Sequence, residues 1–282
     1  MSVLRAFPRS LSRRTSLSAV ALVTLVATVA TTSTAIPAAA AQATQRCAFT
    51  TLVGVRGSTE PAGSGSSNGG RTYTSGGLGD IVGTLARSAA VDRDLPIWVE
   101  AISYPAVILD TANTAAQTYT TSWRAGMRNL FDEIENLAAV CPMTNIVLAG
   151  YSQGAHVIDG VLNGQIGSLS QNARNHISAV VMYGSPAYHQ GDPWNAPGSG
   201  TSNGIFGSAS SVNLGLYQRL AYVPPSYALQ ARSVIRSYCL AGDAFCQTNL
   251  TPAGKRVHES YLSTSIPNDS WSFIKGWLTD NN

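Results

Sequence analysis

The chain has 282 residues, of which 44% are hydrophobic and 12% are charged, and its formal net charge is +3. This length and apolar content suit one mid-sized globular domain with a large core. The low content of charged residues argues against a disordered chain and against a nucleic-acid-binding protein. We therefore expect no nucleic-acid partner.

The first forty residues have the order of regions that is typical of a secretory signal peptide. Four arginines come first, at Arg5, Arg9, Arg13 and Arg14. An apolar run over 19–30 follows, and then a stretch rich in small residues, which predicts cleavage after about Ala41 or Ala43. A membrane anchor is the alternative, but about twelve apolar residues are short for a span. We expect a signal peptide over 1–41, one secreted domain over 42–282, and no stable membrane insertion.

Loss of this leader changes the charge of the chain. The leader carries four of the 18 basic side chains and no acidic one, so 14 basic side chains remain against 15 acidic ones. The mature domain is close to neutral, and nothing in it favours a polyanionic partner.

Short apolar runs rich in β-branched residues recur along the rest of the chain and predict strands. They cover 49–55, 96–103, 145–150, 177–184 and 233–239. The clearest helical pattern covers 115–140, where we take the apolar stripe as core, and further helices are expected after Ser152 and over 269–279. This alternation predicts an α/β fold whose parallel sheet is covered on both faces. The Gly- and Ser-rich stretches 63–70 and 197–210 are typical of surface loops.

Residues 150–154 read GYSQG and follow the apolar run NIVLA (145–149). This arrangement fits the G-x-S-x-G nucleophile elbow, a sharp turn between a strand and a helix that lifts a serine above the sheet. Side chains at the two glycine positions would collide with the neighbouring strand and helix. A Gly-rich turn with an idle Ser152 is the alternative, and the preceding strand favours the elbow.

A serine nucleophile needs a base and an acid that orients the base, and in hydrolases of this architecture the chain order is Ser, acid, His. His258 comes after the last predicted strand, and Asp243 lies just past that strand in CLAGDAFC (239–246). The order Ser152, Asp243, His258 places all three near the carboxyl ends of strands, where ligands gather in such sheets.

The other three histidines are less suitable as the base. His156 lies one turn after Ser152 on the same helix, so we expect a packed or surface side chain there. His176 precedes a strand and should lie at the wrong end of the sheet. His189 follows a strand, but no acid at a strand end stands between it and Ser152, because Asp159 is in mid-helix.

An oxyanion hole requires two donors near the nucleophile. The N–H of Gln153, the residue after the serine, is the expected first donor. The second should come from VRGSTEP (55–61), which follows an early strand and offers Ser58. We expect Arg56 and Glu60 to form an ion pair that fixes this loop, although an ordinary turn is an equal alternative.

All four cysteines lie beyond the leader, and an even count in an exported chain suggests two disulfides. Four cysteines allow three pairings. Because Cys239 and Cys246 are only seven residues apart, a small loop is the simplest partition, and Cys47 would then pair with Cys141. The spacing makes a metal site a poor alternative.

Five motifs in order resemble the cutinase family of serine esterases, which includes cutinases, acetylxylan esterases and cutinase-like lipid esterases. They are RGSTE, YPA at 104–106, GYSQGA at 150–155, C-x3-D-x2-C at 239–246 and the late His258. The resemblance implies a compact α/β-hydrolase with a parallel sheet of about five strands and no large lid. It also implies a role for each site residue: nucleophile Ser152, acid Asp243, base His258, oxyanion hole Ser58 and Gln153, and disulfides Cys47–Cys141 and Cys239–Cys246.

The expected function is a secreted serine esterase that hydrolyses carboxylic esters of short to medium acyl chains through an acyl-enzyme, without metal or organic cofactor. The loop before the histidine, QTNLTPAGKRV (247–257), is mostly polar where fungal cutinases are apolar. This difference keeps acetylxylan esterase open as an alternative. A non-catalytic binding protein on the same scaffold is a third interpretation, which has no need of the three site residues together. We expect a monomer that takes a soluble ester, a polyester, a lipid or an acetylated polysaccharide.

Two further segments are candidates for the substrate site. The apolar AVILD (106–110) is expected at its mouth. The stretch 185–231 holds six aromatic residues, which are Tyr188, Trp194, Phe206, Tyr217, Tyr222 and Tyr227. They could form a substrate wall, or most of them could be core.

Overall fold

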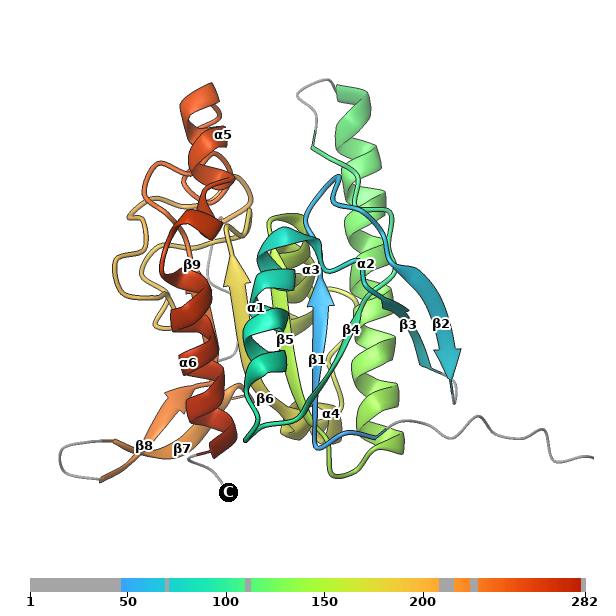
Figure 1. The fold of residues 1–282 in the computed structure, drawn as a ribbon. Helices are drawn as coiled ribbons and strands as arrows, with labels where there is room; N and C mark the ends of the chain where they lie inside the picture. Colours follow the sequence, from blue (N-terminus) through green and yellow to red (C-terminus); the bar gives the residue numbers. More distant parts are fainter. Residues whose placement is uncertain (1–46, 69–70, 110–112, 208–215, 224–227, 280–282) are drawn as a thin grey trace, which may run out of the picture. The chain divides into compact units, whose positions relative to one another are not determined.

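A computed structural model of the chain describes residues 47–68, 71–109, 113–207, 216–223 and 228–279 (Figure 1). All of them belong to the second of two units, Ala41–Asn282. The predicted signal peptide lies outside the described residues. Within these ranges, none of the helices has the length and hydrophobicity that a membrane span requires.

A seven-stranded sheet, in the order β2-β3-β4-β1-β5-β6-β9, forms the centre of this unit. Its parallel part consists of β4 (Ile97–Ala101), β1 (Thr50–Val55), β5 (Asn145–Tyr151), β6 (Ile177–Tyr183) and β9 (Ile235–Tyr238). The central strands β1 and β5 are buried along almost their whole length and mostly apolar, because helices cover both of their faces. The five predicted strands and the parallel arrangement are confirmed.

The expectation of a surface loop over 63–70 is wrong for residues 64–68. Strand β2 (Ser64–Asn68) pairs antiparallel with β3 (Arg71–Ser75), which continues the sheet beyond β4. Glycine and serine favour loops locally, but distant contacts decide here. Arg71 is only 1% exposed and forms ion pairs with Glu100 of β4 and with Glu133 of helix α2 (Asn113–Val140). These ion pairs hold the start of β3 against the rest of the domain.

Helices lie on both faces of the sheet (Figure 1). Helices α1 (Gly79–Val91) and α6 (Ile266–Thr279) pack side by side on one face, and α2 (Asn113–Val140) and α3 (Gln153–Leu162) on the other. The apolar stripe of α2 is core, as expected, since Tyr119, Met127, Leu130, Ile134 and Leu137 are buried. The predicted helices are confirmed, although α6 begins three residues earlier than expected.

Several shorter elements had no counterpart among the predictions. They are α4 (Gln171–His176), α5 (Pro252–His258), a 3-10 turn (Tyr261–Ser263), and the antiparallel hairpin β7 (Gln218–Val223) and β8 (Ala228–Ser233). The stretch 197–207 is irregular, as predicted for the described part of 197–210.

Candidate active site

Ser152 lies in a strained turn between β5 and α3. Its φ of 52° is in the left-handed region, which costs a non-glycine residue of order 1–3 kcal/mol. The glycines on either side are required by their surroundings. A Cβ on Gly150 would lie 2.7 Å from the backbone of Gly154, and one on Gly154 would lie 2.0 Å from the carbonyl oxygen of Val55 at the end of β1. The elbow geometry expected for GYSQG is therefore present.

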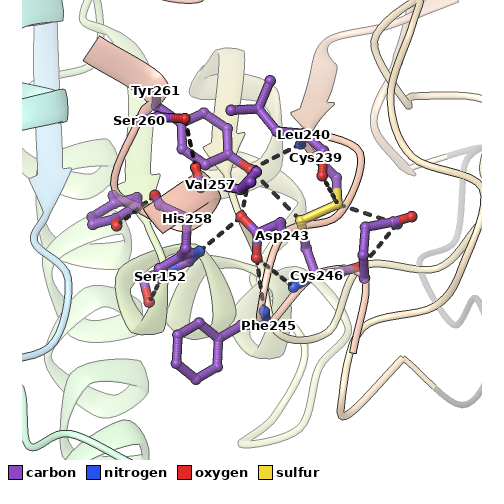
Figure 2. A network of polar contacts seen from close by, with 12 residues as sticks. Ser152, Cys239, Leu240, Asp243, Phe245, Cys246, Val257, His258, Ser260 and Tyr261 are labelled. Carbon is purple, nitrogen blue, oxygen red and sulfur yellow. Dashed lines mark hydrogen bonds and ion pairs between the residues drawn. A yellow bond between two sulfur atoms is a disulfide. The ribbon is translucent and has the colours of Figure 1, made fainter. Parts of the chain in front are cut away.

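The three side chains selected from the sequence meet at one point (Figure 2). His258 Nε2 lies 2.8 Å from Ser152 Oγ, and His258 Nδ1 lies 2.8 Å from Asp243 Oδ2. All three side chains are buried or nearly so. This relay can pass a proton from the serine hydroxyl to an imidazole whose other nitrogen faces a carboxylate.

Asp243 is held as an anion by its hydrogen bonds. Its Oδ1 accepts from the N–H groups of Phe245 and Cys246, at 2.7 and 3.0 Å. Burial alone would raise the pKa of Asp243, but the hydrogen bond and charge of His258, with those two amides, outweigh burial and lower the pKa below its ordinary value. The Cys239–Cys246 disulfide closes the loop that carries this carboxylate. The second disulfide joins Cys47 to Cys141.

Three aromatic residues that the sequence interpretation missed hold the relay. The hydroxyl of Tyr261 donates to Asp243 Oδ2 at 3.0 Å and accepts from the N–H of Leu240 at 3.1 Å. The ring of Tyr151 stacks on the His258 ring at 4.9 Å between centroids, and Phe245 meets the imidazole edge-on at 4.6 Å. No short motif marks these residues, because their roles come from contacts across the fold.

His258 is the last residue of α5, whereas we expected a loop over 247–257. Thr251 accepts the N–H of Gly254 at 3.1 Å as the N-cap, and Pro252 takes the first helical position. A Thr-Pro start is a recognised signal for a helix, so the sequence did contain the information. The polar character of this segment belongs to a helix that carries the histidine.

The two residues expected for the oxyanion hole converge on one atom. The carbonyl oxygen of Val107 accepts from Gln153 Nε2 at 3.0 Å and from Ser58 Oγ at 3.4 Å. Gln153 Oε1 also accepts from Ser122 of α2, at 3.2 Å. As the first residue of α3, Gln153 has a main-chain N–H that no acceptor within the helix can satisfy. Segment 106–109 thus borders the site, as expected, and Ile108 is exposed there.

The expected side-chain ion pair between Arg56 and Glu60 is not what fixes the loop. Arg56 Nε donates to the main-chain carbonyl of Glu60 at 2.8 Å, and its Nη2 donates to the carbonyl of Tyr104 at 2.5 Å. The Glu60 carboxylate accepts from the N–H groups of Gly57 and Asp80, at 2.5 and 2.9 Å. Both side chains bind main-chain groups that have no strand partner, in the loop itself, in the segment after β4 and at the first turn of α1.

The remaining histidines lie where the sequence placed them. His156 is buried, stacked on Trp123 at 4.5 Å, and burial lowers its pKa to about 3, so it is neutral. His176 lies at the amino end of β6, where its Nδ1 is 2.7 Å from the carbonyl oxygen of Thr144. His189 contacts Asp192 at 3.0 Å in the loop after β6. None of the three contacts Ser152 through its ring in the hydrogen bonds of the described residues.

Among the five aromatic residues of 185–231 that the structure describes, Phe206 alone lies beside the site. Tyr188, Trp194 and Tyr217 are buried core, and Tyr227 lies outside the described residues. Tyr222 is exposed on the distant β7–β8 hairpin. Phe206, 44% exposed, stacks on His156 at 5.1 Å, one helical turn from Ser152. Of the two alternatives, a core role therefore holds for Tyr188, Trp194 and Tyr217, and the described aromatic residues do not form a substrate wall.

The profile of the family described as Cutinase matches residues 46–278. The chain belongs to the cutinase family. In the described part of this cutinase-family chain, no group of three or more His, Cys, Asp or Glu side chains could hold a metal ion.

Two curated relatives and one solved structure show the range of similar proteins. Cutinase 11 of Verticillium dahliae is 30% identical over 172 residues, which is 57% of this chain and 52% of that protein. The chain thus spans about half the length of that relative. Acetylxylan esterase 2 of Talaromyces purpureogenus is 26% identical over 242 residues, or 82% of this chain and 88% of that protein. The catalytic core domain of acetyl xylan esterase from Trichoderma reesei superposes with a TM-score of 0.58 at 25% identity, covering 83% of this chain and all of that one.

Proposed function

We propose that this chain is a secreted serine esterase that hydrolyses carboxylic esters through an acyl-enzyme. The single observation that carries the proposal is the continuous relay from Ser152 through His258 to Asp243, with both contacts at 2.8 Å. Membership of the cutinase family supports it. The leader-like sequence over 1–41 and the two disulfides support secretion.

The mechanism assigns a role to each site residue. His258 Nε2 takes the proton of Ser152 as its oxygen attacks the ester carbonyl, and the ionised Asp243 stabilises the imidazolium that forms. The main-chain N–H of Gln153 and the donors of Ser58 stabilise the oxyanion. The alcohol leaves with the proton from His258. Water activated by the same histidine then attacks the acyl-enzyme, which releases the acid and restores the hydroxyl of Ser152.

The substrate class has two candidates. A cutinase-like carboxylesterase with short to medium acyl chains is the first. Acetylxylan esterase is the second, and the polar α5 segment with its two cations, Lys255 and Arg256, supports it because a lipid-facing surface would be apolar. A panel of p-nitrophenyl esters of two to sixteen carbons, with acetylated xylan and a polyester film, separates the two candidates.

Ser152→Ala tests the proposal itself. We expect kcat to fall by several orders of magnitude while the circular dichroism spectrum and the thermal midpoint stay close to those of the wild type. A serine-directed phosphonate should label the wild type and not the variant. Normal hydrolysis by the variant would refute Ser152 as nucleophile, and labelling at another serine would assign the nucleophile to that serine.

A further inference from the structure

A cavity of about 260 Å³ lies between the β7–β8 hairpin and α6, away from the catalytic relay. The hairpin packs at the amino ends of the parallel strands, where Arg219 donates to the carbonyl of Arg174 at 2.7 Å, just before β6. Ser152, by contrast, follows the carboxyl end of β5 (Figure 1). The cavity is therefore separate from the proposed ester-binding site.

Two arginines line this cavity, Arg232 of β8 and Arg236 of β9. The guanidinium of Arg236 lies over the ring of Phe273, 4.3 Å from its centroid, and its Nη1 is 3.4 Å from Asp269 Oδ2. Stacking on the ring fixes the plane of the guanidinium. A guanidinium carries five donors, more than this ion pair engages, and its fork matches a carboxylate.

The other walls of the cavity combine aromatic rings with hydrogen-bonding groups. Trp277 and Phe273 of α6 and Tyr222 of β7 supply the rings, and Asp269 and Ser272 supply an acceptor and a hydroxyl. Tyr222 is 65% exposed, so much of its ring is open to solvent at the edge of the cavity. Such a mixture suits a sugar ring, whose apolar face can pack on an aromatic ring while its hydroxyls bind polar side chains.

We propose that this cavity binds a uronate unit of an acidic polysaccharide. Arg232 and Arg236 hold its carboxylate, the rings pack against its pyranose face, and Asp269 and Ser272 bind its hydroxyls. The volume lies just below the range of about 300–1,000 Å³ that is typical of pockets for drug-sized ligands, so it suits one sugar unit. Asp269 Oδ2 already accepts from Tyr238 at 2.7 Å, and Ser272 Oγ already donates to the carbonyl of Asn268 at 3.1 Å, so Asp269 Oδ1 and the lone pairs of Ser272 Oγ are the acceptors for the sugar hydroxyls. An aromatic carboxylate would meet the same arginines and rings but would bring no hydroxyl to these acceptors.

Titration calorimetry on the mature chain tests this site directly. The probes are tri-galacturonate, the neutral trisaccharide xylotriose, and benzoate. We expect tri-galacturonate to bind at least tenfold more tightly than either of the other two. Salt should weaken its binding, because the contact is between opposite charges.

Three variants assign the binding to the cavity. Arg232→Gln, at an exposed position, should weaken tri-galacturonate binding at least tenfold, and Tyr222→Ala should weaken it severalfold. Arg128→Gln, an exposed arginine of α2 on the other face of the sheet, makes the same charge change and should leave binding unchanged. Arg236→Gln should also abolish binding, with a thermal midpoint measured alongside because this residue contacts Asp269 and Phe273.

The outcomes are distinguishable from those of the esterase proposal. Hydrolysis of p-nitrophenyl acetate by Arg232→Gln should equal that of the wild type, because the cavity holds none of the relay residues. Equal affinity of Arg232→Gln for tri-galacturonate, equal binding of xylotriose or benzoate, or amide shifts in NMR spectra that spare Ser272 and Gly276 would each overturn the proposal. Loss of esterase activity in Ser152→Ala would not affect it.

Discussion

The carboxylate of Asp243 accepts four hydrogen bonds, from His258, Tyr261 and the main-chain N–H groups of Phe245 and Cys246. Such saturation keeps the group ionised and fixes the direction from which it meets the imidazole. It also means that an amide at this position can keep part of the network, which separates the role of the charge from the role of the loop.

Asp243→Asn should therefore lower kcat by about three to four orders of magnitude with little change in fold. The amide oxygen can still accept from Phe245 and Cys246, but the negative charge that stabilises the imidazolium is lost. Steady-state kinetics with a soluble ester and a thermal melt measure the two effects. Activity within tenfold of the wild type would remove Asp243 from the relay.

Tyr261→Phe tests a positioning residue. Loss of its hydroxyl removes one of the two hydrogen bonds to Asp243 Oδ2 and leaves the N–H of Leu240 without its acceptor, so we expect kcat to fall about tenfold with KM unchanged. The matched control is Tyr217→Phe, which removes a buried hydroxyl bonded to the carbonyl of Leu162, far from the relay. If both variants lose stability equally and neither loses kcat, Tyr261 is only structural.

At the scale of elements, the edge of the sheet depends on a buried charge cluster. Arg71 of β3 pairs with Glu100 of β4 and with Glu133 of α2, at 2.5 Å for the latter. Two carboxylates face one guanidinium, and Glu133 Oε2 has no hydrogen-bond partner. Burial, followed by the charge of Glu100, raises the pKa of Glu133, and Arg71 only partly opposes this.

This cluster predicts a pH dependence of stability. At pH values above the ordinary carboxyl pKa of 4.5, the unfolded chain has released the proton of Glu133, whereas the folded chain still keeps it. The free energy of unfolding therefore falls as the pH rises through this window. Glu133→Gln mimics the protonated form and should flatten the fall. Thermal midpoints at about pH 5 and about pH 8 measure it.

The control for this prediction is Asp132→Asn, which removes an exposed carboxylate from the same helix. It should keep the pH dependence of the wild type. A Glu133→Gln variant with an unchanged slope between the two pH values would show that Glu133 titrates normally in the folded chain.

The predicted elements can be recognised from their own residues, whereas the missed elements depend on contacts with residues far away in the sequence. Strands 145–150 and 177–184 can be predicted from their own sequence, because a buried parallel strand must be mostly apolar along its length. The turn at Ser152 is equally local. In contrast, β2–β3 depends on Arg71 meeting Glu100 and Glu133, which are 29 and 62 residues away. No local pattern can show such a contact.

The residues of the candidate site also include some that the sequence could predict and some that it could not. Chain order and strand ends were sufficient to select Asp243 and His258. Tyr261, Tyr151 and the hydrogen bonds of Arg56 to main-chain carbonyls depend on how separate loops pack, and residue spacing does not contain that information. The helix α5 is the exception, because its Thr-Pro start could have been recognised.

At the scale of the whole molecule, the two disulfides should have different effects. Cys47–Cys141 closes 94 residues and ties the start of β1 to the end of α2, whereas Cys239–Cys246 closes seven. By loop-closure entropy, loss of the first costs about 4–5 kcal/mol and loss of the second about 2–3 kcal/mol. The short loop, however, carries Asp243.

Replacing each pair by serine should therefore separate stability from activity. The Cys47/Cys141 double variant should melt at the lower temperature but retain kcat in assays well below its midpoint. The Cys239/Cys246 variant should melt closer to the wild type and lose more kcat. Calorimetry and ester kinetics provide the two readings, and the reverse ranking would contradict the assignment of the short loop to catalysis.

The rings of Tyr151 and Phe245 on either side of His258 have a consequence for the timing of the reaction. Contacts with both rings restrict the rotation of the imidazole, and its Nε2 already lies 2.8 Å from the alcohol in the resting protein. An arriving ester then has to induce little rearrangement of these side chains, and its binding energy remains available for the bond-making step.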